Sequence, residues 1–276
     1  MAVSTGSFRG TPFPPDVLEQ IWVTILTGAP FSQAITPLPT DSGSVAFPKA
    51  APTGAAWVKE LDPLPAVNLN DDADIVAACK LAGLVNLSNE SLDDASIPIG
   101  TLVGNAIRDS MGPTLDEGLL HGDGTPPNPA GIVAKASDAP AGGDFRSAVI
   151  AAYGAAVGAG AMPTSVVAFA HPTAVAEEWA RTDTVGQPLH GDSPSGDLTI
   201  GPGIRVVEVP KLGVAEVLVA DVSSVFLIQR EDFTVEMSAD YGFATDSTAL
   251  RVKARVNVNC PTPAKSLWKA TIAVGP

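Results

Sequence analysis

The sequence predicts an α+β protein in which a long helix and a long strand form one unit and several shorter elements form another. Residues 97–120 place an apolar side chain at about every fourth position, which is the periodicity of a helix with one buried face. Residues 249–258 alternate apolar and polar side chains, as a strand with one buried face does. The helix would span roughly 36 Å and the strand roughly 33 Å, so the two can pack along each other in one elongated domain.

The long helix has a recognisable start and an interruption. Ser96 can cap its amino terminus, and Pro98 suits its first turn. Gly112-Pro113 predicts a kink rather than a stop. Several glycines lower its intrinsic helicity, so packing against a partner must hold it. Its repeating apolar residues are Ile99, Val103, Ile107, Met111, Leu115 and Leu119.

The amino-terminal region predicts an arm and a short helix. Residues 1–15 are rich in Gly, Ser and Pro, which is typical of a mobile or extended segment. Residues 16–26 predict an amphipathic helix that ends at Gly28. The apolar face of this helix needs a surface to cover. Its residues are Val17, Leu18, Ile21, Trp22, Ile25 and Leu26.

A hairpin is predicted from residues 44–49 and 56–60, joined by a turn at Pro52-Thr53-Gly54. Pro48 makes its first strand an edge strand. An isolated two-stranded hairpin is marginal in water, so this one either folds back on its own domain or lies on another subunit. Its few large apolar side chains favour the second arrangement.

The remaining elements are short. A β-rich run is expected at 75–87, loosened at Gly83, and a turn or helical piece at 88–94. Residues 183–203 predict a long loop, rich in Gly and Pro, of the kind that has an external role. Helices are expected at 144–157 and 173–181, and strands at 165–170, 204–209, 215–220 and 224–229.

The composition limits the classes of protein to which the chain can belong. The chain has 276 residues, 45% of them hydrophobic, and can bury a sizeable core. Its formal net charge of -14 argues against tight binding to phosphate backbones, although a container for nucleic acid could still be acidic. Cys79 and Cys260 have no paired spacing, which favours two small buried side chains in a reducing compartment. We expect no secretory signal, because Arg9 is followed by Pro14, Pro15, Asp16 and Glu19. We also expect no membrane span, because no uncharged apolar run reaches roughly 20 residues.

Motifs for catalysis and for cofactors are weak. Gly158-Ala159-Gly160 follows a helix rather than a strand, so a loop is favoured over a dinucleotide site. His171 lies at a strand end, where catalytic groups gather, but a structural histidine is favoured. His121 and His190 are expected in solvated turns. The acidic run 70–74 lacks the glycine and distal glutamate of a calcium loop, so we expect no metal site.

The order of several short motifs gives a more specific signal than any one of them. They are Pro48 with segment 56–60, the strand at 80–82 that runs into 88–94, Gly122-Asp123-Gly124-Thr125 before Pro129-Ala130-Gly131-Ile132, His171-Pro172-Thr173, Asp183 with 186–189, and the strand 251–258 ending in Pro263-Ala264. In this order they resemble the major capsid protein of tailed bacteriophages, the shell-forming family with the Hong Kong 97 fold. The resemblance spans nearly the whole chain.

The resemblance implies a division of the chain. An amino-terminal arm would occupy 1–36 and an extended hairpin loop 37–74, with a peripheral domain from 75–132 and 231–262. That domain would contain the long spine helix and a β-sheet. An axial α/β domain would take 133–230 and 263–276, with Asp183 to Gly203 facing the capsomer centre. The interrupted long helix departs from the family pattern. We also expect no long amino-terminal scaffolding segment before the arm, which suggests a separate scaffold protein.

The function implied is that of a structural shell subunit, without catalysis or cofactor, in the virion capsid. It would form pentamers and hexamers that enclose double-stranded DNA without reading its sequence. Scaffold, portal and decoration proteins are candidate partners. Two alternatives remain: an encapsulin-like compartment that encloses cargo enzymes, and a hydrolase that uses His171. Inter-subunit contacts are expected at Val17, Leu18, Ile21, Trp22, Phe47, Lys49, Trp57, Lys59, Gln187 and Leu189.

Overall fold

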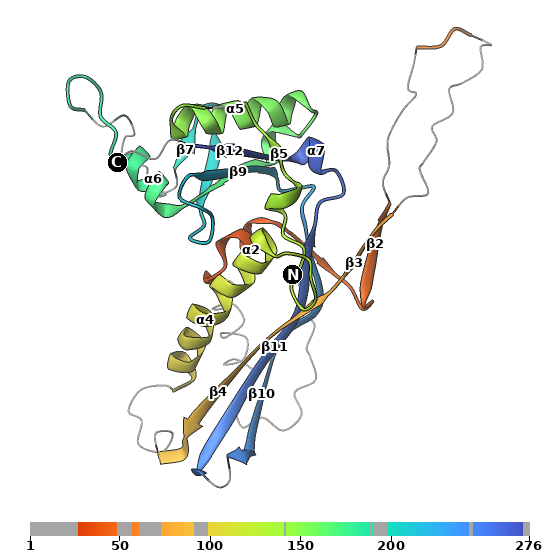
Figure 1. Cartoon of the computed structure of the whole chain (residues 1–276), viewed down its shortest axis with the longest axis vertical. Coiled ribbons are helices and arrows are strands. Elements are labelled where there is room, and N and C mark those ends of the chain that lie inside the picture. The colour runs from red at the N-terminus through yellow and green to blue at the C-terminus, as the bar shows by residue number, and fades with distance from the viewer. Residues whose placement is uncertain are drawn as a thin grey trace.

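The computed structural model describes residues 27–48, 57–60, 73–90, 99–140, 142–187, 189, 198–242 and 245–272. Two sheets form its framework (Figure 1). One is a sheet of four strands, three of them long, beside the long helix α4, and the other is a six-stranded sheet at the opposite end of the molecule. The amphipathic helix expected at 16–26 and most of the acidic run 70–74 lie outside the described residues.

The four-stranded sheet has the order β1-β10-β11-β4. Strand β11 runs antiparallel to β10 and to β4, and β1 pairs in parallel with the start of β10. The predicted strand 249–258 is confirmed within β11, and its apolar residues from Leu250 to Val258 are buried. The strands are β1 Thr36–Pro39, β4 Cys79–Ser88, β10 Phe226–Gly242 and β11 Ser247–Asn259.

Asn257 of this strand is buried, although the alternation places it on the polar side with Arg251 and Lys253. Its Nδ2 donates to the Ala77 carbonyl over 2.6 Å, and its Oδ1 accepts from the Val258 amide over 2.8 Å. These bonds satisfy the buried amide.

Helix α4, Ile99–His121, is the predicted long helix and continues through Gly112-Pro113 as expected. Its buried face holds Ile107, Met111, Leu115 and Leu119. A methyl group added to Gly83 of β4 would lie 3.3 Å from Met111 Sδ, so the glycine lets helix and strand approach. Gly83 does not interrupt the strand, because β4 runs through it from Cys79 to Ser88.

The six-stranded sheet has the order β5-β12-β9-β6-β8-β7, and apolar side chains cover both of its faces. Phe169 and Leu218 join a core with Leu115 and Leu119 of α4, whereas Ala168 and Val219 face the other core. Burial on both faces explains why β6 and the middle of β9 are apolar. The strands are β5 Ser137–Asp138, β6 Val166–Ala170, β7 Thr199–Ile200, β8 Ile204–Glu208, β9 Glu216–Asp221 and β12 Leu267–Thr271.

The second core lies under helix α5, Phe145–Gly158, and receives Ala174 and Val175 from α6, Pro172–Trp179. Both helices match the expected ranges. Helix α5 begins with a capping box, in which Asp144 Oδ1 accepts from the Ser147 amide and Ser147 Oγ accepts from the Asp144 amide. The shorter helices are α2 Pro30–Ala34 and α7 Pro263–Ser266, with 3-10 turns at Val133–Lys135 and Pro163–Ser165.

The predicted hairpin pairing was wrong. Strand β2, Ser44–Pro48, pairs antiparallel with β3, Ala73–Ala77, and Trp57–Glu60 is not a strand. Pro48 sits in a two-stranded ribbon, consistent with its expected edge position. The sequence pattern favoured pairing with the next apolar run along the chain, at 56–60. In the structure β2 pairs with β3, which lies farther along the chain.

Two other expectations are corrected. Strand β10 extends to Gly242, well beyond the predicted end at Gln229. His121, expected in a turn, is the last residue of α4. Gly160, in contrast, lies in a loop as predicted, with a positive φ of 96° that favours glycine.

Candidate assembly surfaces

The β2–β3 ribbon is fixed to the rest of the subunit at Phe47. Its ring stacks on Phe226 of β10, with centroids 5.8 Å apart, and is buried. Phe47 was predicted to contact another subunit, but it lies inside this one. The ribbon therefore has a root in its own subunit.

Trp57 belongs to a short described segment, Trp57–Glu60, that is distant from both sheets (Figure 1). The indole is fully exposed, Val58 is 40% exposed, and Lys59 is also exposed. An exposed indole beside an exposed valine is a candidate contact surface.

A second exposed apolar pair lies in the loop after α6. Asp183 Oδ1 accepts from the amides of Val185 and Gln187 over 2.8 Å and 2.9 Å. Those backbone hydrogen bonds hold the pKa of Asp183 below its usual range. Val185 is 81% exposed and Leu189 is 51% exposed, so an ordered turn presents both side chains to solvent.

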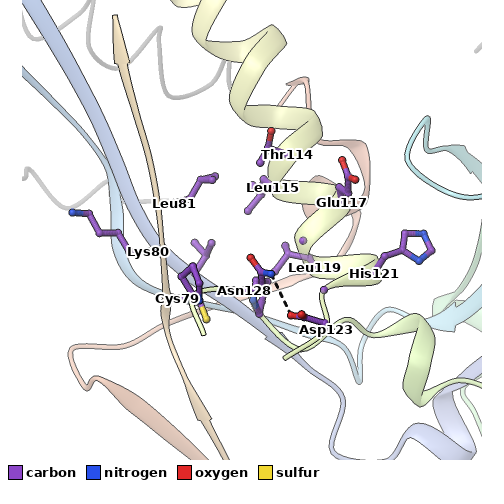
Figure 2. A pocket seen from close by; sticks show the side chains of 15 residues that line it. Cys79, Lys80, Leu81, Thr114, Leu115, Glu117, Leu119, His121, Asp123 and Asn128 are labelled. Atoms are coloured by element: carbon purple, nitrogen blue, oxygen red, sulfur yellow. Dashed lines mark hydrogen bonds between the residues drawn. The ribbon is translucent and has the colours of Figure 1, made fainter. Parts of the chain in front are cut away.

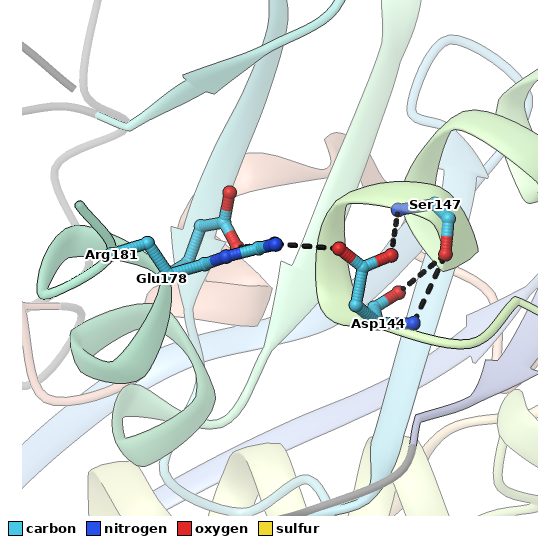
Figure 3. Close-up of polar contacts among 4 residues, drawn as sticks. All are labelled: Asp144, Ser147, Glu178 and Arg181. Carbon is cyan, nitrogen blue, oxygen red and sulfur yellow. Dashed lines mark hydrogen bonds and ion pairs between the residues drawn. The ribbon is translucent and has the colours of Figure 1, made fainter. Parts of the chain in front are cut away.

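Arg181 ties the base of this loop to two helices (Figure 3). Its Nη1 lies 2.6 Å from Asp144 Oδ2 at the start of α5 and 3.1 Å from Glu178 Oε2 of α6. Glu178 is buried, so the guanidinium supplies a cation where water is excluded. Hydrogen bonds from Ser147 and Arg181 lower the pKa of Asp144 to about 2, so its carboxylate stays ionised.

Asp116 joins α2 to α4. Its two oxygens accept from the amide of Phe31 over 2.9 Å and from the amide of Ser32 over 3.1 Å. The Phe31 ring meets Phe169 edge to face, with centroids 5.1 Å apart. The segment that leads from the amino-terminal region is thus fixed to α4 and to the core that α4 shares with both sheets.

A groove of about 520 Å³ lies between β4, the carboxyl-terminal half of α4 and the turn after it (Figure 2). Asp123 crosses that turn and accepts from Asn128 Nδ2 over 3.2 Å and from the Thr125 amide over 3.0 Å. Cys79 lines the groove, and burial raises the pKa of its thiol. A thiol with a raised pKa is not an activated nucleophile.

The described residues offer no other basis for catalysis. His171 caps α6, and its Nδ1 accepts from the Thr173 amide over 3.2 Å, which is a structural role. The part of the chain that the structure describes holds no cluster of three metal-ligating side chains. None of its helices is both long and apolar enough to cross a membrane.

The predicted contact residues fall into three groups. Trp57, Lys59, Gln187 and Leu189 are exposed on two separate loops, and Phe47 is buried. The others, Val17, Leu18, Ile21, Trp22 and Lys49, lie outside the described residues. Sequence reasoning missed the exposed apolar side chains of Ile75, Leu84, Val185 and Tyr241. For Leu84 the signal was present, because alternation in β4 places it opposite the buried side chains.

Comparison with known protein families distinguishes among the functions that the sequence left open. The sequence matches the model described as "Phage capsid family" over residues 10–264. The chain belongs to the phage capsid family. It is a major capsid protein, a structural component of the virion that forms the icosahedral shell of a tailed phage. This confirms the expected family and excludes the hydrolase reading of His171.

Solved capsids share the fold of this capsid protein. The Microbacterium phage Oxtober96 structure matches with a TM-score of 0.69 and 19% identity, covering 98% of this chain and 96% of that one. The capsid of a native GTA particle matches with a TM-score of 0.64 and 18% identity, covering 99% and 95%. A virus-like particle from Pyrococcus furiosus matches with a TM-score of 0.64 and 11% identity, covering 93% and 98%. A search of curated proteins found no significant match.

Proposed function

We propose that this capsid protein assembles as pentamers and hexamers that enclose double-stranded DNA, and that the Trp57 loop clamps one subunit to the next. The observation that carries the clamp is the contrast between Phe47 and Trp57, which both lie in the segment 37–74. Phe47 is packed within the subunit on Phe226, whereas Trp57 is fully exposed. The exposed indole would be buried, and the contact stabilised, if Trp57 packed against the surface of a second subunit.

The domain division follows the family resemblance and agrees with the arrangement of the sheets. Helix α4 and most of the four-stranded sheet would form the peripheral domain, from 75–132 and 231–262, whereas β1 and the first residues of β10 fall outside these bounds. The six-stranded sheet with α5 and α6 would form the axial domain, from 133–230 and 263–276. The arm would be 1–36 and the extended loop 37–74. The ordered turn with Val185 and Leu189 would then face the capsomer centre and contact its copies there.

The enclosed DNA would be held without sequence-specific contacts. A net charge of -14 per subunit repels phosphate, so the shell would confine the genome rather than grip it. Scaffold, portal and decoration proteins would act at assembly. An encapsulin-like compartment is the alternative: particles that contain cargo protein instead of DNA would favour it.

The clamp is tested by Trp57→Ala, with Trp179→Ala as the matched control. The Trp57 indole is fully exposed, so the variant should keep the melting temperature of the subunit and lose particles. Trp179 packs against the core under α5, so its loss should lower the melting temperature. Thermal unfolding of unassembled subunits and sedimentation of particles measure the two effects.

The opposite pattern would overturn the clamp. If Trp57→Ala lowers the melting temperature and leaves the particle yield intact, the indole belongs to the subunit core. If the wild-type chain remains a compact monomer in light scattering at every salt and protein concentration, assembly itself is refuted.

A further inference from the structure

We propose that Asn257 is a positioning residue for shell assembly: its buried side chain fixes the direction in which the β2–β3 ribbon leaves the four-stranded sheet. The chain between β2 and β3 contains Trp57, so this direction determines where the exposed indole can meet a neighbouring subunit. The inference rests on the proposed clamp and names the residue that orients it. Three observations carry it: the end of the β11–β4 ladder, the hydrogen bonds of the Asn257 amide, and the burial of that amide.

The ribbon begins where the ladder between β4 and β11 ends. The last register pair of that ladder is Cys79 with Val256. Ala78 belongs to neither β3 nor β4, and Ala77 pairs with Ser44 of β2. Figure 1 shows β3 and β2 leading away from β11 and β10. The chain therefore passes from one sheet to another across a single residue.

Asn257 spans this junction. It is the next residue of β11 after the ladder with β4 ends. Its Nδ2 donates to the Ala77 carbonyl at the end of β3 over 2.6 Å and lies 3.8 Å from Cys79 Sγ at the start of β4. A side chain, rather than a further backbone pair, thus joins the two strands at the point where they diverge.

The Asn257 amide is held in one orientation. Its Oδ1 accepts from the Val258 amide over 2.8 Å, so its Nδ2 is directed to the junction. The residue is only 5% exposed, and a buried amide that lost these partners would have no water to replace them. The position of the Ala77 carbonyl relative to β11 is therefore closely constrained.

The other contacts at the root of the ribbon constrain its direction less. The Ala78 amide donates to the Gly43 carbonyl over 3.1 Å, which joins the two chains of the ribbon to each other. Phe47 stacks on Phe226, which joins β2 to β10. Stacked rings tolerate small displacements, whereas a hydrogen bond is directional. Asn257 is thus the contact that sets the angle between ribbon and sheet.

This angle matters because Trp57–Glu60 is distant from both sheets (Figure 1). A small rotation of the ribbon at its root becomes a larger displacement at Trp57. Subunits whose ribbons leave at different angles would present the indole at different places, and neighbouring subunits would then meet at different angles. By holding one angle, Asn257 gives the shell a uniform curvature.

Asn257→Leu tests the proposal, because it removes both hydrogen-bonding groups and nearly keeps the size of the side chain. Amide hydrogen exchange at residues 42–48 and 73–78 of unassembled subunits should rise by about tenfold, since the ribbon loses its directional contact. Particles should become heterogeneous in diameter by electron microscopy.

Asn259→Leu is the matched control. Asn259 is buried on the same strand, and its Oδ1 accepts from Lys135 Nζ over 3.0 Å instead of bonding the ribbon. The control variant should lower the melting temperature of the subunit and leave both ribbon exchange and particle diameter unchanged. Equal broadening of the diameters in the two variants would show that general destabilisation, and not the ribbon, is responsible.

Asn257→Asp gives a second test through its pH dependence. An ionised carboxylate has no donor for the Ala77 carbonyl, whereas a protonated carboxyl can donate an O–H. Ribbon exchange and particle diameter should therefore be abnormal at about pH 8 and return toward wild type at about pH 5, each compared with wild type at the same pH. The Cys79 thiol stays neutral across this range, because burial raises its pKa. Asn257→Leu should show no recovery.

The outcomes separate this inference from the clamp. Wild-type ribbon exchange in Asn257→Leu, or raised exchange with uniform particles, would overturn the positioning role. If Asn257→Leu does not fold, an Asn257→Asp variant that is abnormal at about pH 8 and does not recover at about pH 5 would also overturn it. Heterogeneous particles from Asn257→Leu beside a full yield from Trp57→Ala would refute the clamp and leave the positioning role standing. A wild-type chain that never assembles would refute the proposed assembly, and with it the role of Asn257 in the shell.

Discussion

The hydroxyl of Ser32 donates a 2.6 Å hydrogen bond to the buried carboxylate of Asp116, across 84 positions of sequence. The same carboxylate also accepts from the amides of Phe31 and Ser32. Burial raises the pKa of Asp116 to about 6, although the three hydrogen bonds act to lower it. The link between α2 and α4 thus contains a group that titrates near neutral pH.

Asp116 should make the subunit more stable as the pH falls. Its pKa is higher in the folded state than the ordinary aspartate value of 3.8, so the folded chain binds more protons between about pH 4 and 6. The contribution is fully present below about pH 4 and is lost as the pH rises through about 6. The free energy of unfolding, compared with that of Asp116→Asn, should rise by on the order of 1–3 kcal/mol from pH 7.5 to 4.

Urea unfolding of unassembled subunits across this pH range measures the difference. The control is Asp109→Asn, on the same helix, where the side chain is 66% exposed. If the carboxylate is desolvated as the structure indicates, the difference in the free energy of unfolding between wild type and Asp116→Asn changes with pH and does not decrease as the pH falls. A difference that is independent of pH, or that decreases as the pH falls, would contradict the prediction.

Gly112 should tolerate no side chain. A methyl group there would lie 2.7 Å from the backbone carbonyl of Gly28, so one of the two segments must move. Gly112→Ala should lower the free energy of unfolding by about 1–3 kcal/mol, despite the higher helix propensity of alanine.

Gly154 provides the opposite case in α5. Nothing lies within 4 Å of an added methyl group, so Gly154→Ala should raise the free energy of unfolding by about 0.5–1 kcal/mol. Denaturant unfolding of the two variants side by side checks both signs. Equal stabilisation by both would mean that α4 does not pack closely on the segment at Gly28.

Arg181→Ala should destabilise the subunit, because it removes the cation beside the buried carboxylate of Glu178. The expected loss is about 1–3 kcal/mol, measured by thermal unfolding. Arg108→Ala is the matched control: that arginine pairs with its exposed neighbour Asp109 and should cost less than about 0.5 kcal/mol. Equal losses of stability in the two variants would show that the burial of Glu178 does not affect the free energy of unfolding.

Elements with unbroken local periodicity were predictable from the sequence. Helix α4 and strand β11 each repeat one apolar pattern along their length, and α5 has a recognisable amino-terminal cap at Asp144. These signals are local, so tertiary structure was not needed to read them. The order of the short motifs then predicted the family.

The failures involved irregular or distant pairing. In β10 the register shifts between Gln229 and Glu231 and again between Glu231 and Thr234. Each shift interrupts the alternation of side chains, so the sequence pattern predicted an end at Gln229 and missed the rest of the strand. Strand β2 pairs with β3 across an excursion that no local rule detects. The prediction that Phe47 contacts another subunit failed for the same reason, because its partner Phe226 is distant in sequence.

Assembly should strengthen with moderate salt. Subunits that each carry a charge of -14 repel one another, and the Debye length falls from about 30 Å at 0.01 M to about 10 Å at 0.1 M. The repulsion between subunits is therefore screened over this range, and light scattering in sodium chloride should show a rising particle yield. A yield that does not change with salt would show that charge repulsion does not limit assembly.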